Sequence, residues 1–169
     1  MKYSVEQFSA WIVALGAAAF FCIGCKPFQR DQARELVNAA GGSPYAVSNL
    51  LARGADVNAR SKTTFGWTPL ISAIYHHKED VVDLLLVCGA DVNIGDSMGD
   101  TPLNWTITVW EENTNLIRKL VRRGANPKIR NRYGSDAFDL AGSKRNSDEI
   151  SEIIRSERPS QPQSSAPVP

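Results

Sequence analysis

Apolar residues are distributed unevenly along the chain. Residues 10–21 form a continuous run without a charged side chain, whereas later in the sequence short apolar groups alternate with polar turns. In two later segments the apolar residues recur at the spacing of one helix face. They are Val81, Val82, Leu84, Leu85 and Leu86 in the first segment, and Leu116, Ile117, Leu120 and Val121 in the second. Both segments are predicted to be amphipathic helices that bury one face against neighbouring helices.

Two motifs recur along the chain. The first, Leu-Leu-x-x-Gly-Ala-Asp-Val-Asn, occurs at 50–58 and 85–93 and in altered form at 120–127, and its glycines, Gly54, Gly89 and Gly124, are 35 residues apart. The second, Gly-x-Thr-Pro-Leu, occurs at 66–70 and 99–103, with a weakened copy at 134–138. Such self-similarity is typical of a repeat architecture.

The residue types in the two motifs predict where helices begin and end. Thr68, Thr101 and Asp136 can cap a helix by accepting a hydrogen bond from a free backbone N–H, and the prolines after both threonines suit a first helical turn. The three glycines suit the left-handed conformation that ends a helix. Each repeat is therefore predicted to be a helix pair, and turns or short hairpins such as 56–65 join one pair to the next.

A period of 33 to 35 residues with these two motifs resembles the ankyrin repeat. The resemblance covers about residues 30–155 and implies an all-α solenoid of about four stacked helix-turn-helix units. The first pair, 30–52, is expected to be the N-terminal cap and the last, 136–155, the C-terminal cap. No pair can bury its apolar face alone, so the stack is expected to fold as one unit.

The chain departs from the ankyrin pattern at three places. The histidine that usually follows Thr-Pro-Leu is replaced by Ile71, Asn104 and Asp139, so its bridging role must be lost or taken over. The glycine that usually ends the first helix of a pair is His77, a residue type that tolerates a left-handed backbone only moderately. Two extra residues in 110–114 are expected to lengthen the turn within the third pair.

The apolar run near the start is an export signal in form. It extends over 15 residues from Ala10 to Gly24, whereas a membrane span usually needs about 20, so a signal peptide is favoured over a transmembrane anchor. The run ends in Cys-Ile-Gly-Cys, which resembles a bacterial lipoprotein signal with Cys25 as the lipidated residue, although Cys22 stands where that pattern usually has Leu. The resemblance implies a signal peptide at 1–24 and a short lipid-attached spacer at 25–29. Residues 156–169, rich in Pro, Ser and Gln, are predicted to be a disordered tail.

The cysteines do not suggest a disulfide framework. If the leader is removed and Cys25 carries lipid, only Cys88 is left, and one thiol cannot form a bridge within the chain. Cys88 is expected to be a small, partly buried residue, with a redox-active thiol as the alternative. Cys22 and Cys25 also form Cys-x-x-Cys, but a redox or metal function requires a folded scaffold rather than a hydrophobic leader.

Charge is balanced over the whole chain but not along it. The formal net charge is +1, which favours neither nucleic acid nor anionic lipid as a partner. Residues 76–115 carry a net charge of −7 and residues 118–145 a net charge of +7. These charges either form solvated helix faces or make a bipolar surface that orients a partner.

The sequence offers little for catalysis. His76 and His77 are adjacent, and neighbouring helix residues point about 100° apart, so the two rings cannot chelate one metal ion and are expected to be solvated. No glycine-rich phosphate loop and no recognisable nucleophile–base motif is present. We therefore expect no enzymatic activity, no cofactor, no metal and no small-molecule substrate.

Ankyrin-like stacks bind partners through their hairpin tips and the exposed face of each first helix. Carried over from the Gly-x-Thr-Pro-Leu motif, this surface is predicted to include Phe65, Trp67, Tyr75, His76, Met98, Asp100, Thr108, Arg132 and Tyr133, beside Thr64, Ser97, Val109 and Ser135. Its aromatic and methionine side chains are residue types enriched at interface centres. Phe65 and Tyr133 could instead be local hairpin staples, and Trp105 and Leu140 are expected to pack between repeats.

Together these features predict a non-enzymatic, protein-binding lipoprotein of the bacterial cell envelope, anchored through Cys25 and facing the periplasm. Two roles stay open for it: immunity against a periplasmic toxin, and support of an envelope enzyme such as one in oxidative-stress defence. A membrane-tethered structural adaptor without one dedicated partner is the alternative.

Overall fold

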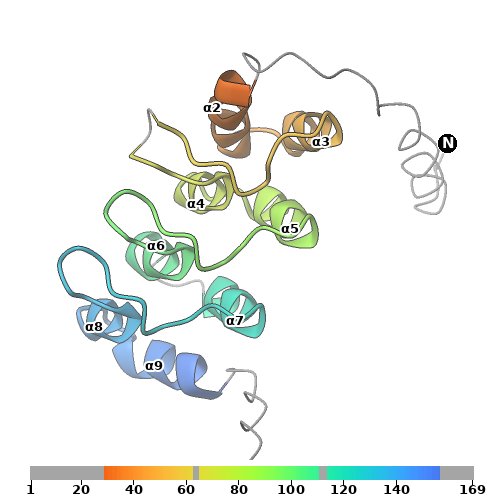
Figure 1. The fold of residues 1–169 in the computed structure, drawn as a ribbon. Coiled ribbons are helices and arrows are strands. Elements are labelled where there is room, and N and C mark those ends of the chain that lie inside the picture. Colours follow the sequence, from red (N-terminus) through yellow and green to blue (C-terminus); the bar gives the residue numbers. More distant parts are fainter. Residues whose placement is uncertain (1–28, 63–64, 111–113, 157–169) are drawn as a thin grey trace, which may run out of the picture.

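The computed structural model describes residues 29–62, 65–110 and 114–156 (Figure 1). Within these ranges the chain forms eight helices and no strand, and none of the helices is long and apolar enough to cross a membrane. The all-α repeat stack predicted from the sequence is confirmed. The four helix pairs are α2 (Gln29–Ala40) with α3 (Pro44–Ala52), α4 (Pro69–Tyr75) with α5 (Glu79–Val87), α6 (Pro102–Val109) with α7 (Thr114–Arg122), and α8 (Ala137–Gly142) with α9 (Ser147–Ser156).

The pairs stack so that corresponding helices form two rows. Helices α2, α4, α6 and α8 lie in one row, α3, α5 and α7 in the other, and α9 closes the stack against α7 and α8 (Figure 1). The segments that join one pair to the next project from the row of α4, α6 and α8 (Figure 1). This arrangement brings residues about one repeat apart in sequence side by side along one face.

The residues that were expected to begin and end helices do so. Thr68 and Thr101 each accept a hydrogen bond, 3.2 Å long, from the backbone N–H three residues ahead. Asp136 and Asp139 form a reciprocal capping box at the start of α8. Gly54, Gly89 and Gly124 have φ angles of 87°, 85° and 88°, the left-handed conformation that ends each second helix. Local chemistry therefore sets the boundaries of these helices.

A continuous core runs through the stack. The inward faces of successive pairs contribute large side chains that are less than 2 % exposed. They include Leu36, Leu70, Ile74, Leu85, Leu103, Ile107, Leu120 and Ile154. Leu85 is completely buried, as its place in the helical pattern predicted. Because each pair completes the core of the next, the stack buries apolar area that a single pair would expose.

The departures from the ankyrin pattern have distinct structural outcomes. Ile71 and Asn104, which replace histidine, are buried in the first turns of α4 and α6, whereas Asp139 serves in the capping box. His77 has a φ of 55°, so the left-handed position expected there is confirmed although the residue is not glycine. Its ring packs against that of Trp110, with 4.7 Å between ring centroids.

Trp110 has a structural role that the sequence did not reveal. It follows α6 directly, where we expected an extended turn, yet its side chain is buried and Nε1 donates a 2.8 Å hydrogen bond to the Ile74 carbonyl of the preceding pair. Two basic side chains make similar bonds, one from the same pair as Trp110 and one from the next pair. Arg123 donates to the Leu86 carbonyl and Lys144 to the Thr108 carbonyl. In each case a later repeat donates to a carbonyl group in the last turn of an earlier helix, where the regular helical pattern of hydrogen bonds ends. The carbonyls of Ile74 and Leu86 also accept a backbone N–H from the turn that follows their own helix.

Asparagine side chains connect the repeats behind each second helix. Oδ1 of Asn58 accepts the Asp91 N–H at 2.8 Å, and Oδ1 of Asn93 accepts the Asn126 N–H at 2.7 Å. Nδ2 of Asn93 also donates to the carbonyl of Gly124. The last residue of the Gly-Ala-Asp-Val-Asn motif therefore links each turn to the next repeat.

Cys88 differs from expectation. It was predicted to be partly buried, but it is exposed, because it lies at the C-cap of α5 beside Val87, which is also exposed. The predicted signal peptide with Cys22 and Cys25 falls outside the described residues, as do most of the spacer and of the tail. Those features stay predictions.

Candidate interaction surface

Three large aromatic rings meet on the row of α4 and α6. Trp67 precedes α4, Tyr75 ends it, and Trp105 lies in the first turns of α6. The ring centroids of Trp67 and Tyr75 are 4.7 Å apart, and that of Trp105 lies 5.5 Å from Trp67 and 5.6 Å from Tyr75. We call Trp67, Tyr75 and Trp105 the aromatic cluster; the His76 ring meets Tyr75 edge-on at 5.2 Å.

The aromatic cluster is only partly covered by the protein. Tyr75 is 43 % exposed, and Trp67 and Trp105 are half-buried. Trp105, which we expected between repeats, does pack against the core, but it also completes this surface cluster. Its Nε1 donates to the carboxylate of Asp96 at 3.0 Å, whereas the buried Nε1 of Trp67 has no hydrogen-bond partner among the described residues.

The tips of the three connecting segments are in register with one another. Ser61, Asp96 and Asn131 occupy equivalent positions, because the backbone N–H of each donates to a carbonyl four to six residues ahead in its own turn. By this register Phe65, Met98 and Tyr133 are the equivalent tip residues. The Ser97 N–H donates to the Phe65 carbonyl and the Arg132 N–H to the Met98 carbonyl, each at 2.8 Å, so neighbouring tips are joined through their backbones.

Two of the tip residues expose nearly their whole side chains. Phe65 and Tyr133 are each 75 % exposed, and Met98 is half-buried. Exposure on this scale argues against the alternative in which Phe65 and Tyr133 are local hairpin staples. Phe65 also has a φ of 46°, a left-handed backbone that is uncommon for an aromatic residue.

Glycines allow the tips to approach closely. A Cβ atom at Gly66 would lie 2.3 Å from Oγ of Ser97, and one at Gly99 would lie 3.2 Å from the Cα of Asn131. Both residues also have a positive φ. The glycine of the Gly-x-Thr-Pro-Leu motif is thus required where one turn lies against the next.

Several predicted contact residues have their polar groups occupied within the chain. The Asp100 carboxylate accepts the side-chain amide of Asn131 at 2.7 Å, and the Thr108 hydroxyl donates to the carbonyl of Asn104. His76 is exposed, but its ring lies against the backbone of Gly41. A Cβ atom added to Gly41 would be only 2.5 Å from Cδ2 of the His76 ring. These three residues lie on the predicted surface, and their side chains also serve the fold. Thr64 lies outside the described residues.

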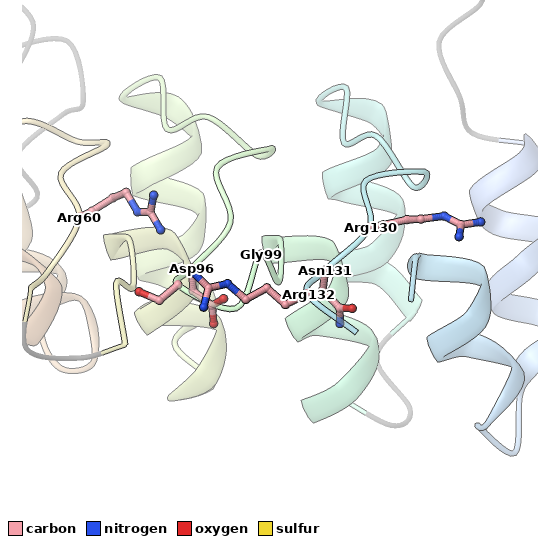
Figure 2. A pocket seen from close by; sticks show the side chains of 7 residues that line it. Arg60, Asp96, Gly99, Arg130, Asn131 and Arg132 are labelled. Carbon is pink, nitrogen blue, oxygen red and sulfur yellow. The ribbon is translucent and has the colours of Figure 1, made fainter. Parts of the chain in front are cut away.

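The hairpin tips also carry a pocket lined by three arginines, of which sequence reasoning found only Arg132. Arg60, Arg130 and Arg132 line a hollow of about 420 Å³ together with Asp96, Ser97, Gly99 and Asn131 (Figure 2). Figure 2 shows the Arg60 and Arg132 side chains pointing toward one another and that of Arg130 pointing away. Arg60 and Arg130 occupy equivalent positions, because each directly precedes the residue whose N–H closes its turn. This equivalence depends on hydrogen bonds that the sequence motifs do not show, so sequence reasoning had no signal for it.

The two oppositely charged stretches of sequence partly neutralise one another. Lys119 on α7 forms a salt bridge with Asp83 on α5, and Arg123 and Lys144 are held on backbone carbonyls of earlier repeats. Some of the acidic and basic side chains therefore pair between neighbouring repeats. The two segments do not form two fully separate charged ends of the stack.

Comparison with known proteins identifies the repeat. The family model described as "Ankyrin repeats (3 copies)" matches residues 36–131, more than half of the chain. The chain belongs to the ankyrin-repeat family. Ankyrin repeats are in general protein-interaction modules without catalytic activity, so a protein-binding role follows from membership.

Relatives of this ankyrin-repeat chain include proteins of animals and of a virus. A mitochondrial disaggregase of Bos taurus is 30 % identical over 168 aligned residues, covering 78 % of this chain and 24 % of the relative. An ankyrin repeat protein of fowlpox virus is 34 % identical, covering 74 % of this chain and 38 % of the relative. The B-cell lymphoma 3 protein homolog of Mus musculus is 32 % identical over 128 residues, 27 % of its length. The chain thus spans well under half of each of these proteins.

Proposed function

We propose that this ankyrin-repeat protein is a non-enzymatic binding module that holds a protein partner against the aromatic cluster and the hairpin tips. The observation that carries the proposal is the set of large side chains exposed on one face. Phe65 and Tyr133 are each 75 % exposed, and Tyr75 is 43 % exposed. Exposed aromatic groups that cluster on a folded protein mark interaction sites more often than isolated ones do.

The cluster has the properties of an interface centre. Aromatic side chains bury a large area with few rotatable bonds, and they are enriched among residues that dominate binding energy. Trp67 and Trp105 hold Tyr75 through ring contacts, so Tyr75 is ordered before a partner arrives. A preordered anchor loses less conformational entropy on binding than a mobile one.

Site-specific photo-cross-linking in cells tests this function. With p-benzoylphenylalanine at Tyr75, we expect a covalent adduct of one discrete mass. The matched control is Val87, which is 77 % exposed but lies on α5, in the row opposite the hairpins. Adducts of the same mass from both positions, or no adduct at Tyr75, would refute the assignment of the partner to this face.

Affinity measurements on the captured partner give the second test. Trp67→Ala and Tyr75→Ala should each weaken binding by about 2 kcal/mol or more, the range of an interface hot spot. The circular dichroism spectra of the variants show whether folding is retained. Wild-type affinity in both variants would mean that the aromatic cluster is not the contact.

We further propose that the protein is a lipoprotein of the bacterial cell envelope, anchored through Cys25 and facing the periplasm. This part rests on residues 10–25 alone: an uncharged apolar run that ends in Cys-Ile-Gly-Cys. Cys25→Ser should leave the precursor unprocessed or release the protein from membranes. A Cys25→Ser protein that still fractionates as a cleaved membrane protein would rule lipidation out.

Two biological roles fit a binding module at this location, and they make opposite predictions for the partner. An immunity protein abolishes the activity of a bound toxin, whereas an accessory factor of an envelope enzyme, for example in oxidative-stress defence, preserves or raises activity. The activity of the cross-linked partner with and without the ankyrin-repeat protein separates these roles. Only weak binding to many proteins would favour the membrane-tethered adaptor.

A further inference from the structure

We propose that the partner segment recognised by the hairpin tips is acidic, with its carboxylates bound by Arg60 and Arg132. This inference rests on the proposed protein-binding function and specifies the chemistry of the partner. The two arginines lie in the first and third turns, more than one repeat apart, and both line the same pocket. Figure 2 shows that their guanidinium groups point toward one another across it.

The arginines are not neutralised within the described part of the chain. No salt bridge joins Arg60, Arg130 or Arg132 to any carboxylate there, and Arg60 is held only by a 3.4 Å hydrogen bond from Nε to the Gly66 carbonyl. That bond leaves the outer guanidinium nitrogens of Arg60 available. The gathered positive charges repel one another, and an anionic group between them would relieve that repulsion.

The carboxylate that lines the pocket does not meet this need. Asp96 is 5 % exposed, and its Oδ1 accepts the N–H groups of Met98 and Asp100 at 2.8 and 3.0 Å. Its Oδ2 accepts Nε1 of Trp105. Two hydrogen bonds from its own hairpin and one from α6 spread the negative charge of Asp96, so the solvent side of the pocket is dominated by the guanidinium groups.

The geometry favours a carboxylate on a peptide over an isolated ion. A guanidinium can donate two parallel hydrogen bonds to one carboxylate, which gives orientation as well as attraction. The hydroxyl of Ser97, which makes no hydrogen bond within the described part of the chain, also lines the pocket and is a further donor. Phe65 and Tyr133 at the neighbouring tips add exposed apolar area beside the charges.

The stack also sets a spacing for the partner. Packed helices lie about 8 to 10 Å apart, and an extended chain rises about 3.3 Å per residue, so an extended segment along the tips meets a new hairpin about every third residue. The hairpins that carry Arg60 and Arg132 are two steps apart, which corresponds to about six residues of extended chain. Because the two side chains point toward one another (Figure 2), carboxylates up to about six residues apart, with an aromatic or aliphatic residue between them, would match Arg60 and Arg132 on one side and the tip residues on the other. We therefore infer an extended acidic segment with interspersed apolar side chains.

A random peptide library tests this inference on the full chain. Twelve-residue peptides displayed on phage are selected against the wild-type protein, and the winners are measured by fluorescence anisotropy. The test variant is Arg60→Gln with Arg132→Gln. The matched control is Arg34→Gln with Arg145→Gln. It also removes two positive charges, but from exposed positions that do not line the pocket.

We expect the selected peptides to carry at least two Asp or Glu residues within about six positions of one another. Each charge-assisted contact is worth about tenfold in affinity, so the test variant should bind them at least tenfold more weakly, while the control retains wild-type affinity. Raising the salt concentration should weaken wild-type binding more than binding by the test variant.

Several results would overturn the acidic-segment proposal. These are selection of peptides without acidic residues, selection of no peptide at all, and equal losses in the test and control variants. If inorganic phosphate or an oligonucleotide, added at the same concentration of negative charge, displaced the selected peptide, the pocket would be a general anion site instead. Arginine-dependent binding to vesicles of phosphatidylethanolamine and phosphatidylglycerol would show a lipid surface. Cross-linking at Tyr75 is independent of both arginines, so a positive result there with any of these outcomes would leave the protein-binding function standing.

Discussion

The indole N–H groups of Trp67, Trp105 and Trp110 meet three different environments. Trp110 donates to the Ile74 carbonyl and Trp105 to the Asp96 carboxylate, whereas the buried N–H of Trp67 has no hydrogen-bond partner in the described part of the chain. A buried polar group without a hydrogen bond costs free energy, and a satisfied one contributes. Trp110 and Trp67 therefore form a natural pair for measuring what one inter-repeat hydrogen bond contributes.

Trp110→Phe should destabilise the protein by about 1 to 2 kcal/mol more than Trp67→Phe does. Both changes shorten an aromatic side chain by a similar amount, but only the first removes a hydrogen bond that joins two repeats. The free energy of unfolding is measured in urea by circular dichroism, because each variant loses a different one of the four tryptophans and the fluorescence signals of the two variants are therefore not comparable. Equal losses in the two variants would mean that the Trp110 hydrogen bond contributes nothing to stability.

Phe65 combines an unfavourable backbone conformation with an exposed ring, which supports our proposal that it contacts the partner. Its φ of 46° is a conformation that costs a bulky residue free energy, and its side chain is 75 % exposed. Phe65→Asn should therefore leave the free energy of unfolding unchanged or raise it by up to about 1 kcal/mol, since asparagine tolerates the left-handed region. The same variant should bind the partner more weakly. A destabilisation above about 1 kcal/mol would show that the Phe65 ring supports the fold.

At the scale of the element, the sequence predicted the helices well because their boundaries depend on local chemistry. Thr68 and Thr101 cap the helices that follow them, and Gly89 adopts the predicted left-handed φ. The arginine pocket could not be predicted in the same way. Arg60 and Arg132 are 72 positions apart, and the first turn is two residues longer than the others, so their proximity depends on the register of three stacked hairpins.

The aromatic cluster was predicted only in part for a related reason. Trp67 and Tyr75 were assigned to the surface from their places around the Gly-x-Thr-Pro-Leu motif, whereas Trp105 was assigned to packing between repeats. The helical pattern gives the direction of a side chain but not its distance from the neighbouring helix. Trp105 lies at the edge of the interface between α4 and α6, where one ring can both contact the core and be partly exposed.

Asn93→Ala tests the side-chain bridge between repeats. Asn93 accepts the Asn126 N–H and donates to the Gly124 carbonyl, so its loss removes two hydrogen bonds between neighbouring units and should cost about 1 to 3 kcal/mol. Asn126→Ala is the control, because the Asn126 side chain accepts only the nearby Lys128 N–H and the change should cost about 1 kcal/mol or less. Urea unfolding measures both, and the reverse order would contradict the bridging role.

At the scale of the whole molecule, neighbouring repeats share both core and polar contacts. Backbone hydrogen bonds join the tips, asparagines join the turns behind the second helices, and Trp110, Arg123 and Lys144 each satisfy a carbonyl in an earlier repeat. Neighbouring repeats are thus joined both at the hairpin tips and in the turns behind the second helices. A stack connected in this way should unfold as one cooperative unit, since opening one interface exposes the core of the next.

Truncations at the centre and at the end of the stack test this cooperativity. Leu85 on α5 is fully buried and Ile153 on α9 is 2 % exposed, so Leu85→Ala and Ile153→Ala should each cost about 2 to 5 kcal/mol. In a Trp11→Phe background, fluorescence reports the central repeats through Trp67, Trp105 and Trp110, while circular dichroism reports all helices. Cooperative unfolding requires that both signals have the same midpoint in the parent protein and shift together in both variants. If Ile153→Ala moved only part of the dichroism signal and left the fluorescence midpoint in place, the last helix pair would unfold on its own. A loss well under 1 kcal/mol for Leu85→Ala would show that the central core does not hold the stack together.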